Sequence, residues 1–381
     1  SRVQKLVQSA FAGKPKDIIS QSVAKALYGE VSPYSATRLE RFAACAFAHF
    51  LQYGMKLTER VEYEFKPMDM GNVMHEALES FAEEVRKRGM KWTELTEQER
   101  NEIADRCLDN IVADYGNTVL KSSARNEYMI ERTRRILRRT VWALQKQLEQ
   151  GEFQPEGFEV TFGGGRIDRV DIMEDQNKVY VKVIDYKTGN TSFDLVYLYH
   201  GLQLQLMIYL DGALRVEQKK YPDKEIIPAG VFYYNIKDPM IQEKIDADVE
   251  AVSAGLMKEL KMNGLVQADP ELVYRMDSSL GSIPVAFNKD GSFRKNSSVA
   301  DRTQFAVLGR YVRTKIEKIR SSILEGDAEV SPYELGKKNA CTYCPYMTVC
   351  GFDRRLSGYE FRRLKNFSDE ELWKAFDREA E

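Results

Sequence analysis

Residues 165–171 read Gly-Arg-Ile-Asp-Arg-Val-Asp, and residues 183–189 read Val-Ile-Asp-Tyr-Lys-Thr-Gly. Both stretches belong to a region of strand signals that begins near Phe158 and continues to Tyr186. The polar run Glu-Asp-Gln-Asn at 174–177 predicts a turn between them. The sequence therefore predicts a β-hairpin that carries an acid on each arm.

The register of this hairpin decides whether its acids meet. If the turn occupies 174–177, Met173 faces Lys178, and Asp185 is a diagonal neighbour of Asp168, roughly 7–8 Å away on the same face. Lys187 shares that face because strand side chains alternate with a period of two. A slip of one residue would place the two acids on opposite faces.

Two carboxylates at the end of an otherwise apolar strip repel each other and lose hydration. A divalent cation would resolve that conflict, and oxygen ligands favour Mg²⁺ or Mn²⁺. Such an ion could polarise a phosphodiester and activate a water molecule. Lys187 could orient that water or neutralise charge that develops on phosphate oxygens. The alternative interpretation is a cross-strand salt bridge between Lys187 and Asp168 or Asp185.

The chain has 381 residues, of which 43% are hydrophobic and 30% charged, and its formal net charge is -2. This composition is typical of a globular protein. Any nucleic-acid contact must therefore come from local basic patches. We find no apolar run long enough to span a bilayer and no Gly-x4-Gly-Lys-Ser/Thr loop for ATP. Because the chain begins with Ser, we expect a piece of a longer protein or a processed product.

The helical and extended patterns predict one α/β domain with a helical insertion. We expect a helical lead-in over 1–34, the domain itself over 35–367 with its insertion at 71–150, and a C-terminal helix over 368–381. The other expected elements are helices at 36–53, 195–221, 242–263 and 300–326, strands at 61–65, 158–186 and 227–236, and a hairpin at 283–295.

Five cysteines are an odd number, which argues against a disulfide scaffold and favours metal ligation in a reducing cytoplasm. Cys341-x2-Cys344-x5-Cys350 places three thiols in one short segment, and Cys45 lies near the start of the chain. Four thiolates suit a [4Fe–4S] cluster, whereas structural zinc sites more often use two Cys-x2-Cys pairs or a pair with His. Both interpretations stay open on spacing alone. Cys107 falls at helical spacing among apolar residues, so we expect it in the core.

Four motifs follow one another along the chain. They are Met-Gly-Asn-Val-Met-His at 70–75 on a predicted helix, the two strand motifs at 165–171 and 183–189, and Gln-Leu-Met-Ile-Tyr at 205–209. This order resembles the RecB-type branch of the PD-(D/E)XK nucleases. In that branch a helix with His precedes a strand with Asp, a strand with Asp-x-Lys and a helix with Gln-x3-Tyr. The resemblance implies a restriction-endonuclease-like core, with a mixed central sheet flanked by helices.

The resemblance also implies roles for individual residues. The metal ligands would be His75, Asp168, Asp185 and the backbone carbonyl of Tyr186, and Lys187 would be the catalytic lysine.

Two further groups are candidates for DNA contact. By the same resemblance, Gln205 and Tyr209, at i and i+4 on one helix face, would contact DNA or support the site. Arg132, Arg135 and Arg139 lie on one face of a predicted helix and could track phosphates. The alternatives are a structural role for the first pair and a solvated, ion-paired helix face for the arginines.

The cysteines resemble the iron–sulfur staple of RecB-family nucleases, which include the AddB-type subunit of bacterial ATP-dependent helicase–nucleases and the Cas4-like and Dna2-like nucleases. Residues 35–51 are similar to the segment that carries the first cluster Cys in AddB-type subunits, except that Ala46 stands where Pro is usual. The resemblance covers about 25–360 and favours the AddB type, because Cas4-like proteins lack the long helical insertion. It implies a [4Fe–4S] cluster on the four cysteines, joining the N-terminal and C-terminal segments.

The function implied by the resemblance is a Mg²⁺-dependent deoxyribonuclease of exonuclease type. It would act in the cytoplasm, in recombinational DNA repair, on single-stranded DNA that a helicase exposes at double-strand ends. AddB-type subunits pair with an AddA-type helicase–nuclease subunit, and no membrane is involved. The alternatives are a Cas4-like or Dna2-like exonuclease and, from another class, a DNA-binding or assembly module whose nuclease site is vestigial.

Overall fold

The computed structural model describes residues 3–4, 18–29, 34–58, 67–114, 123–163, 165–241 and 248–380. The chain divides into two compact units. The sheet unit comprises Glu62–Phe193 and Tyr209–Ala306, and the cysteine unit comprises Ser1–Val61, Asp194–Ile208 and Val307–Glu381. The domain boundaries at 35 and 367 stay a prediction.

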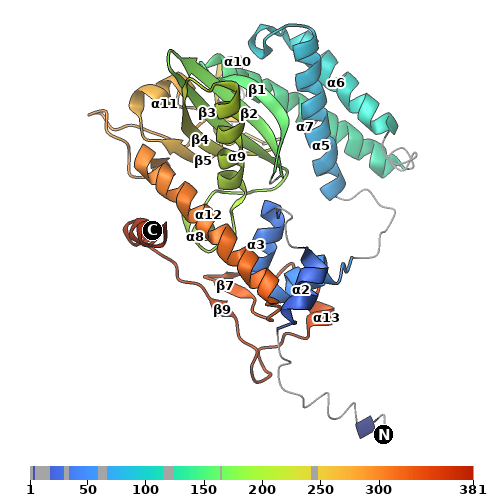
Figure 1. Ribbon diagram of the computed structural model, residues 1–381. Helices are drawn as coiled ribbons and strands as arrows, with labels where there is room; N and C mark the ends of the chain where they lie inside the picture. The colour runs from blue at the N-terminus through green and yellow to red at the C-terminus, as the bar shows by residue number, and fades with distance from the viewer. Residues whose placement is uncertain are drawn as a thin grey trace. The chain divides into compact units, whose positions relative to one another are not determined.

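The sheet unit is built on one six-stranded mixed sheet (Figure 1). Neighbouring strands are antiparallel, except that β3 with β4 and β5 with β6 are parallel. The strands lie in chain order: β1 (Gln154–Phe162), β2 (Gly165–Asp175), β3 (Lys178–Lys187), β4 (Glu225–Asn235), β5 (Asn263–Gln267) and β6 (Val299–Ala300). Two parallel neighbours need a crossover, and the chain between β3 and β4 contains α8 (Leu195–Tyr199) and α9 (Gln205–Lys220).

The β2–β3 hairpin has a tighter turn than the sequence suggested. Asp175 pairs with Lys178, and Gln176 has a positive φ of 42°, as residues of two-residue hairpin turns often do. This register, continued one step beyond the recorded pairs, sets Asp168 directly opposite Asp185. The expected diagonal placement was therefore wrong. The predicted shared face is retained, because an error of two residues equals one side-chain period.

The described part of the stretch at 71–150 is helical, as predicted, and its helices cover one face of the sheet. The hydroxyl of Ser123 caps the last of them by accepting the N–H of Asn126 at 3.2 Å. These helices share one apolar core with the sheet, to which Phe81, Leu108 and Phe232 contribute. In Figure 1, α9 crosses in front of the sheet. The helical elements of this unit, besides α9, are α5 (Pro67–Lys87), a 3-10 turn (Trp92–Glu94), α6 (Glu97–Asp114), α7 (Ala124–Glu149), α10 (Val249–Glu259) and α11 (Pro270–Met276).

The cysteine unit combines helices with a three-stranded sheet of order β8-β7-β9. Besides α8, its elements are α2 (Gln21–Tyr28), α3 (Ala36–Ala44), α4 (Ala46–His49), a π-helical turn (Phe50–Gly54), α12 (Arg302–Glu325, from Val307 onward), β7 (Tyr333–Leu335), β8 (Lys338–Asn339), α13 (Met347–Cys350), β9 (Arg362–Arg363) and α14 (Asp369–Ala380). At the start of α14 the Ser368 N–H donates to Glu371 Oε2 at 3.1 Å, which is one of the two hydrogen bonds of a capping box.

The helix expected over 36–53 is interrupted, and this correction bears on the cysteines. Ser35 caps α3 by accepting the N–H of Arg38 at 3.3 Å. The helix then stops at Cys45, which is extended (φ -166°, ψ 117°) and stands at the N-cap of α4. Ala46 is thus the first residue of a new helix, the position at which Pro is favoured.

Three other expectations need correction. The helix expected over 195–221 is two helices, α8 and α9, with a break between them. The helix expected over 242–263 is described only as α10, and Asn263 begins β5 instead. The hairpin at 283–295 is reduced to a bridge between Phe287 and Phe293. The strand expected at 61–65 lies outside the described residues. None of the described helices is long and apolar enough to cross a bilayer.

Candidate functional site

Acidic side chains form a row across the sheet. In the β1–β2 ladder, Phe158 pairs with Arg169 and Val160 pairs with Ile167. Glu159, which lies between them, therefore stands beside Asp168. Asp168 stands opposite Asp185 in the next ladder, and Asp185 pairs with Tyr233 of β4. Three carboxylates therefore occupy neighbouring strands at one level of the sheet, with an aromatic residue at the end of the row.

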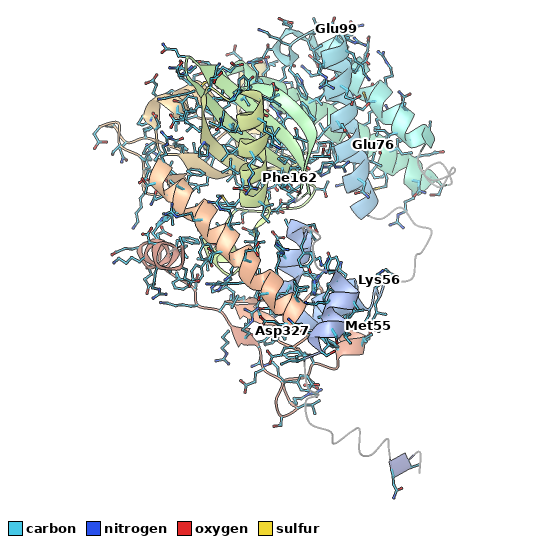
Figure 2. The ribbon with its side chains drawn as sticks, in the orientation of Figure 1. Met55, Lys56, Glu76, Glu99, Phe162 and Asp327 are labelled. Carbon is cyan, nitrogen blue, oxygen red and sulfur yellow. The ribbon has the colours of Figure 1, made fainter. Side chains whose placement is uncertain are left out.

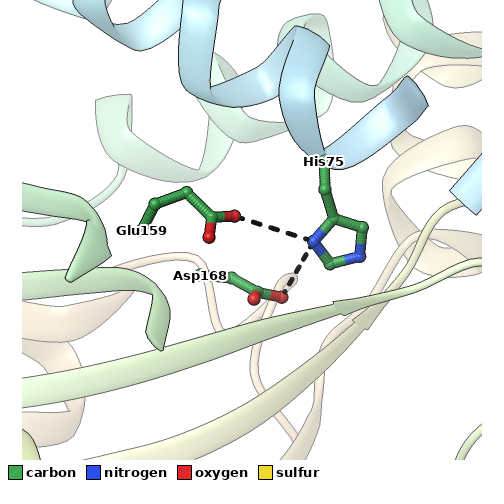
Figure 3. Close-up of side chains that lie close together, drawn as sticks. All are labelled: His75, Glu159 and Asp168. Carbon is green, nitrogen blue, oxygen red and sulfur yellow. Dashed lines mark ion pairs between the residues drawn. The ribbon is translucent and has the colours of Figure 1, made fainter. Parts of the chain in front are cut away.

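His75 reaches this row from α5 (Figure 3). Its Nδ1 lies 3.3 Å from Asp168 Oδ2 and 3.9 Å from Glu159 Oε1. One ligand atom from each of the three residues lies within 4.8 Å of the other two. The predicted pairing of the helix histidine with the strand acid is therefore present, and Glu159 joins them.

The hydrogen bonds around the two aspartates differ. Asp168 Oδ2 accepts the backbone N–H of Tyr186 at 2.7 Å, which ties β2 to the Asp-x-Lys segment of β3. Asp185 is only 1% exposed, and Lys187 Nζ lies 2.7 Å from its Oδ2. That contact pairs the buried carboxylate with the ammonium group and opposes the rise of the Asp185 pKa. Lys187 also lies over the ring of Tyr233, at 5.4 Å from its centroid.

Like charges and burial shift the pKa values of this site. Burial, followed by the charge of Asp168, raises the pKa of Asp185 to about 7, although neighbouring cations oppose the shift. The same two causes raise the pKa of Glu159 to about 7. Burial alone would lower the pKa of His75, but its hydrogen bond to Asp168 and the nearby carboxylates raise it. The three carboxyl groups are thus close enough to oppose one another's ionisation.

These residues fit a hard divalent cation. Carboxylate oxygens and an imidazole nitrogen are ligands that Mg²⁺ and Mn²⁺ accept. Asp185 is 1% exposed, and Lys187 Nζ is the cation next to its Oδ2; a divalent ion would further offset the cost of burying this charge beside Asp168. The donor set that the structure brings together is His75, Glu159 and Asp168; Asp185, on the neighbouring strand β3, stays a predicted ligand. The backbone carbonyl of Tyr186 stays a predicted ligand.

Glu159 was not predicted from the sequence. A signal was present, because the glycine run at 163–165 predicts a turn, and a tight turn there places Glu159 opposite Asp168. The backbone conformation could not be foreseen: Glu159 has a φ of 49°, which is rare for a non-glycine residue inside a strand. Such conformations cluster at functional sites, where the surrounding structure holds them.

Tyr209 and Gln205 both lie on α9. The ring of Tyr209 packs edge-on against Phe162, labelled in Figure 2, with the ring centroids 5.9 Å apart. A Cβ placed on Gly165 would lie 3.5 Å from the Tyr209 ring, so Tyr209 supports the start of the strand that carries Asp168. Gln205 belongs to the cysteine unit, where its backbone N–H donates to Glu40 Oε1 at 3.0 Å. Their contact with DNA stays a prediction.

The arginines of α7 are largely engaged by carboxylates. Arg135 Nε lies 2.5 Å from Asp238 Oδ2, and the guanidinium of Arg139 lies over Trp142. Arg132 is exposed. The neighbouring arginines at 134 and 138 pair with acids of α6. A phosphate-tracking role for this face stays a prediction.

The four predicted cluster cysteines line one pocket in the cysteine unit. Cys45 is buried, whereas Cys341, Cys344 and Cys350 are partly exposed. Burial, followed by the other three thiols, raises the pKa of Cys341 to about 12. Backbone N–H groups point at the sulfurs: that of Phe352 lies 3.5 Å from Cys350 Sγ. The pocket therefore joins a segment near the start of the chain to one near its end.

The fifth cysteine lies elsewhere. Cys107 is buried in the core of the sheet unit, as its helical spacing predicted.

Comparison with known proteins shows which family this arrangement represents. The chain is 42% identical, over its whole length, to the AddB-type subunit of the ATP-dependent helicase/deoxyribonuclease of Lachnoclostridium phytofermentans and covers 34% of that protein. The protein of the same name from Thermoanaerobacter sp. is 34% identical, and the match covers 100% of this chain and 35% of that protein. The one from Clostridium acetobutylicum is 35% identical, and the match covers 95% of this chain and 33% of that protein. The chain spans about a third of the length of the curated relatives it matches. The profile of the PD-(D/E)XK nuclease superfamily matches residues 33–351, so the chain belongs to that superfamily.

Proposed function

We propose that this chain is a divalent-metal-dependent deoxyribonuclease domain that cuts single-stranded DNA produced by a helicase at double-strand ends. The observation that carries the proposal is the row of three carboxylates, Glu159, Asp168 and Asp185, with His75 beside it. The relatives are named as subunits of a helicase/deoxyribonuclease, which supports DNA as the substrate and an AddA-type helicase subunit as the partner. The complete protein would act in recombinational repair.

The chain's own residues divide the work of hydrolysis. His75, Glu159, Asp168 and Asp185 would hold Mg²⁺ or Mn²⁺, which when bound supplies a Lewis acid and a water of lowered pKa. Lys187 would stabilise the negative charge that grows on the phosphate oxygens at the transition state. Its ammonium is well placed for this, because it is 28% exposed while the aspartate beside it is buried.

The proposal can be tested with Asp185→Ala and a matched control. Glu174→Ala removes an acid from the same face of β2 as Asp168, six residues away and paired with Lys224 at 2.7 Å. Both variants and the parent are assayed on single-stranded DNA with Mg²⁺ or Mn²⁺. We expect Asp185→Ala to lose cutting by at least a hundredfold, whereas Glu174→Ala keeps it. Equal cutting by Asp185→Ala and the parent would refute the site, and absence of cutting by all three would favour a vestigial site.

We further propose that Cys45, Cys341, Cys344 and Cys350 hold a [4Fe–4S] cluster with a structural role. The pocket that they share supports a metal centre. Four thiolates are the ligand set of a [4Fe–4S] cluster, whereas structural zinc sites more often use two Cys-x2-Cys pairs or a pair with His. A cluster there would cross-link the two ends of the cysteine unit.

The test is the visible absorption, iron content and sulfide content of anaerobically purified protein. The parent and Cys107→Ser should carry the cluster, because Cys107 lies in the other unit's core. Cys350→Ser should lose most of the iron. A colourless parent that holds one zinc ion per chain would refute the cluster without affecting the nuclease proposal.

A further inference from the structure

A second cation accompanies Lys187 at the acidic row. Arg166 precedes Asp168 by two residues on β2, so it shares the face of Asp168. Lys187 likewise follows Asp185 by two residues on β3, beyond the last recorded β2–β3 pair, Arg169 with Ile184. Two cations, Arg166 and Lys187, therefore lie two residues beyond Asp168 and Asp185 on their strands, at the level next to these carboxylates.

Arg166 has one partner in the described part of the chain. Its Nε contacts Glu159 Oε2. The Arg166 side chain is 63% exposed, whereas that of Glu159 is 7% exposed. The guanidinium thus borders solvent while it touches a buried acid of the candidate metal site, and its two terminal nitrogens remain available for a second acceptor.

Metal and arginine compete for the same carboxylate. Glu159 offers its other oxygen, Oε1, towards His75 and Asp168. A cation held by these residues would neutralise Glu159 and so weaken its attraction for Arg166. A guanidinium released in this way presents a planar fork of donors that matches a phosphate group in geometry and charge.

We propose that Arg166 contacts the DNA phosphate at the candidate site, and that Glu159 retains it until a divalent cation binds. The inference rests on the proposed nuclease function and extends it to a substrate-contacting residue. The phosphate would lie between the metal and the level formed by Arg166 and Lys187, so cation binding and phosphate binding would reinforce each other.

The test compares Arg166→Ala and Arg166→Lys with a control arginine. Arg302→Ala is the control, because Arg302 is 55% exposed and pairs with Glu225. Glu225 stands opposite Lys178, at the far end of β3. That end lies seven residues from Asp185, or about 23 Å along the strand.

The first readout is binding, measured by fluorescence anisotropy of a labelled single-stranded oligonucleotide at several salt concentrations. Each phosphate contact on single-stranded DNA contributes about 0.7 to the slope of log Kd against log salt. With Ca²⁺ present, we expect Arg166→Ala to lose about that much of the slope, whereas Arg166→Lys and Arg302→Ala keep it. With EDTA, the parent and Arg166→Ala should have equal slopes, because Arg166 then remains on Glu159.

The second readout is cutting with Mn²⁺. We expect Arg166→Ala to lower kcat by roughly tenfold or more and Arg166→Lys to recover part of it, because the charge remains but the fork does not. Slopes and rates equal to those of the parent in both Arg166 variants would refute the inference. Equal loss of slope with and without cation would refute retention by Glu159. If the parent does not cut at all, the nuclease proposal fails, while the cation-dependent slope still decides the phosphate contact.

Discussion

Asp185→Asn should make the metal-free protein more stable, although it removes the ion pair with Lys187. The pKa of Asp185 is raised from 3.8 to about 7 by burial and by the charge of Asp168. Above pH 7 the folded state must carry that charge, and three pKa units correspond to about 4 kcal/mol. An asparagine of the same shape carries no charge, so we expect a gain of at least about 1 kcal/mol and at most about 4 kcal/mol at about pH 8.

The pH dependence of the effect has a definite sign. A carboxyl whose folded pKa is raised binds its proton more tightly in the folded state than in the unfolded state. Asp185 therefore contributes stability at low pH and loses it as the pH rises from about 4 through about 7. The gain in Asp185→Asn should be absent near pH 4 and complete at about pH 8. Metal should reverse the ranking at high concentration, because an ion that binds only the folded parent adds ~4.1 kcal/mol at about a thousand times its Kd.

Asp171→Asn is the matched control, since Asp171 lies on the same hairpin and is fully buried. Its carboxylate binds Arg169 at 2.6 Å and Lys182 at 3.1 Å. Its loss would leave two buried cations unpaired and cost about 3–5 kcal/mol. The measurement is urea unfolding in EDTA and in Mn²⁺ at several pH values. Destabilisation of the metal-free protein by Asp185→Asn at about pH 8, as expected for Asp171→Asn, would refute this reasoning.

Mn²⁺ affinity, measured by calorimetry, should rise with pH through about 7. The carboxyl groups of Glu159 and Asp185 both have pKa values of about 7 and must lose their protons to bind the ion. An affinity that does not change with pH would contradict the assignment of both ligands. Glu159→Gln should weaken Mn²⁺ binding by roughly tenfold or more, whereas Glu174→Gln on the neighbouring strand should leave it unchanged, and equal affinities in the two variants would remove Glu159 from the site. Ser123→Ala removes the side-chain cap of α7 and should cost about 1 kcal/mol in denaturant unfolding, with no change in Mn²⁺ affinity; a neutral effect would show that the cap is redundant.

The chemistry-bearing residues of the hairpin could be identified from the sequence because strand geometry is periodic. Asp168, Asp185 and Lys187 share a face, as predicted, even though the turn was misplaced by two residues. The error was harmless because it equalled the side-chain period. The exact neighbour relation was not predictable, because the tight turn depends on Gln176 adopting a positive φ.

The helices were predicted least well where they end. The sequence pattern continues through Cys45, yet the backbone there is extended and α4 starts afresh. A run of good helix formers does not reveal that break, since the packing of Cys45 against Tyr346 and its neighbours decides it. The break in the helix expected over 195–221 is different, because the sequence carries a signal for it: Gly201 follows the C-cap of α8 with a φ of 77°.

The sequence by itself determined the local chemistry: the Asp-x-Lys motif, the clustered cysteines of 341–350 and the alternation that aligns acids on one strand face. These are determined locally because strand and turn geometry relate residues that are close in the chain. Only the tertiary structure decided that Glu159 completes the row, that His75 of α5 lies 3.3 Å from Asp168, and that Cys45 joins the distant thiols in one pocket. Those contacts depend on how separate elements pack, which no single segment contains. The burial and the charges that this packing produces then set the pKa values of the site.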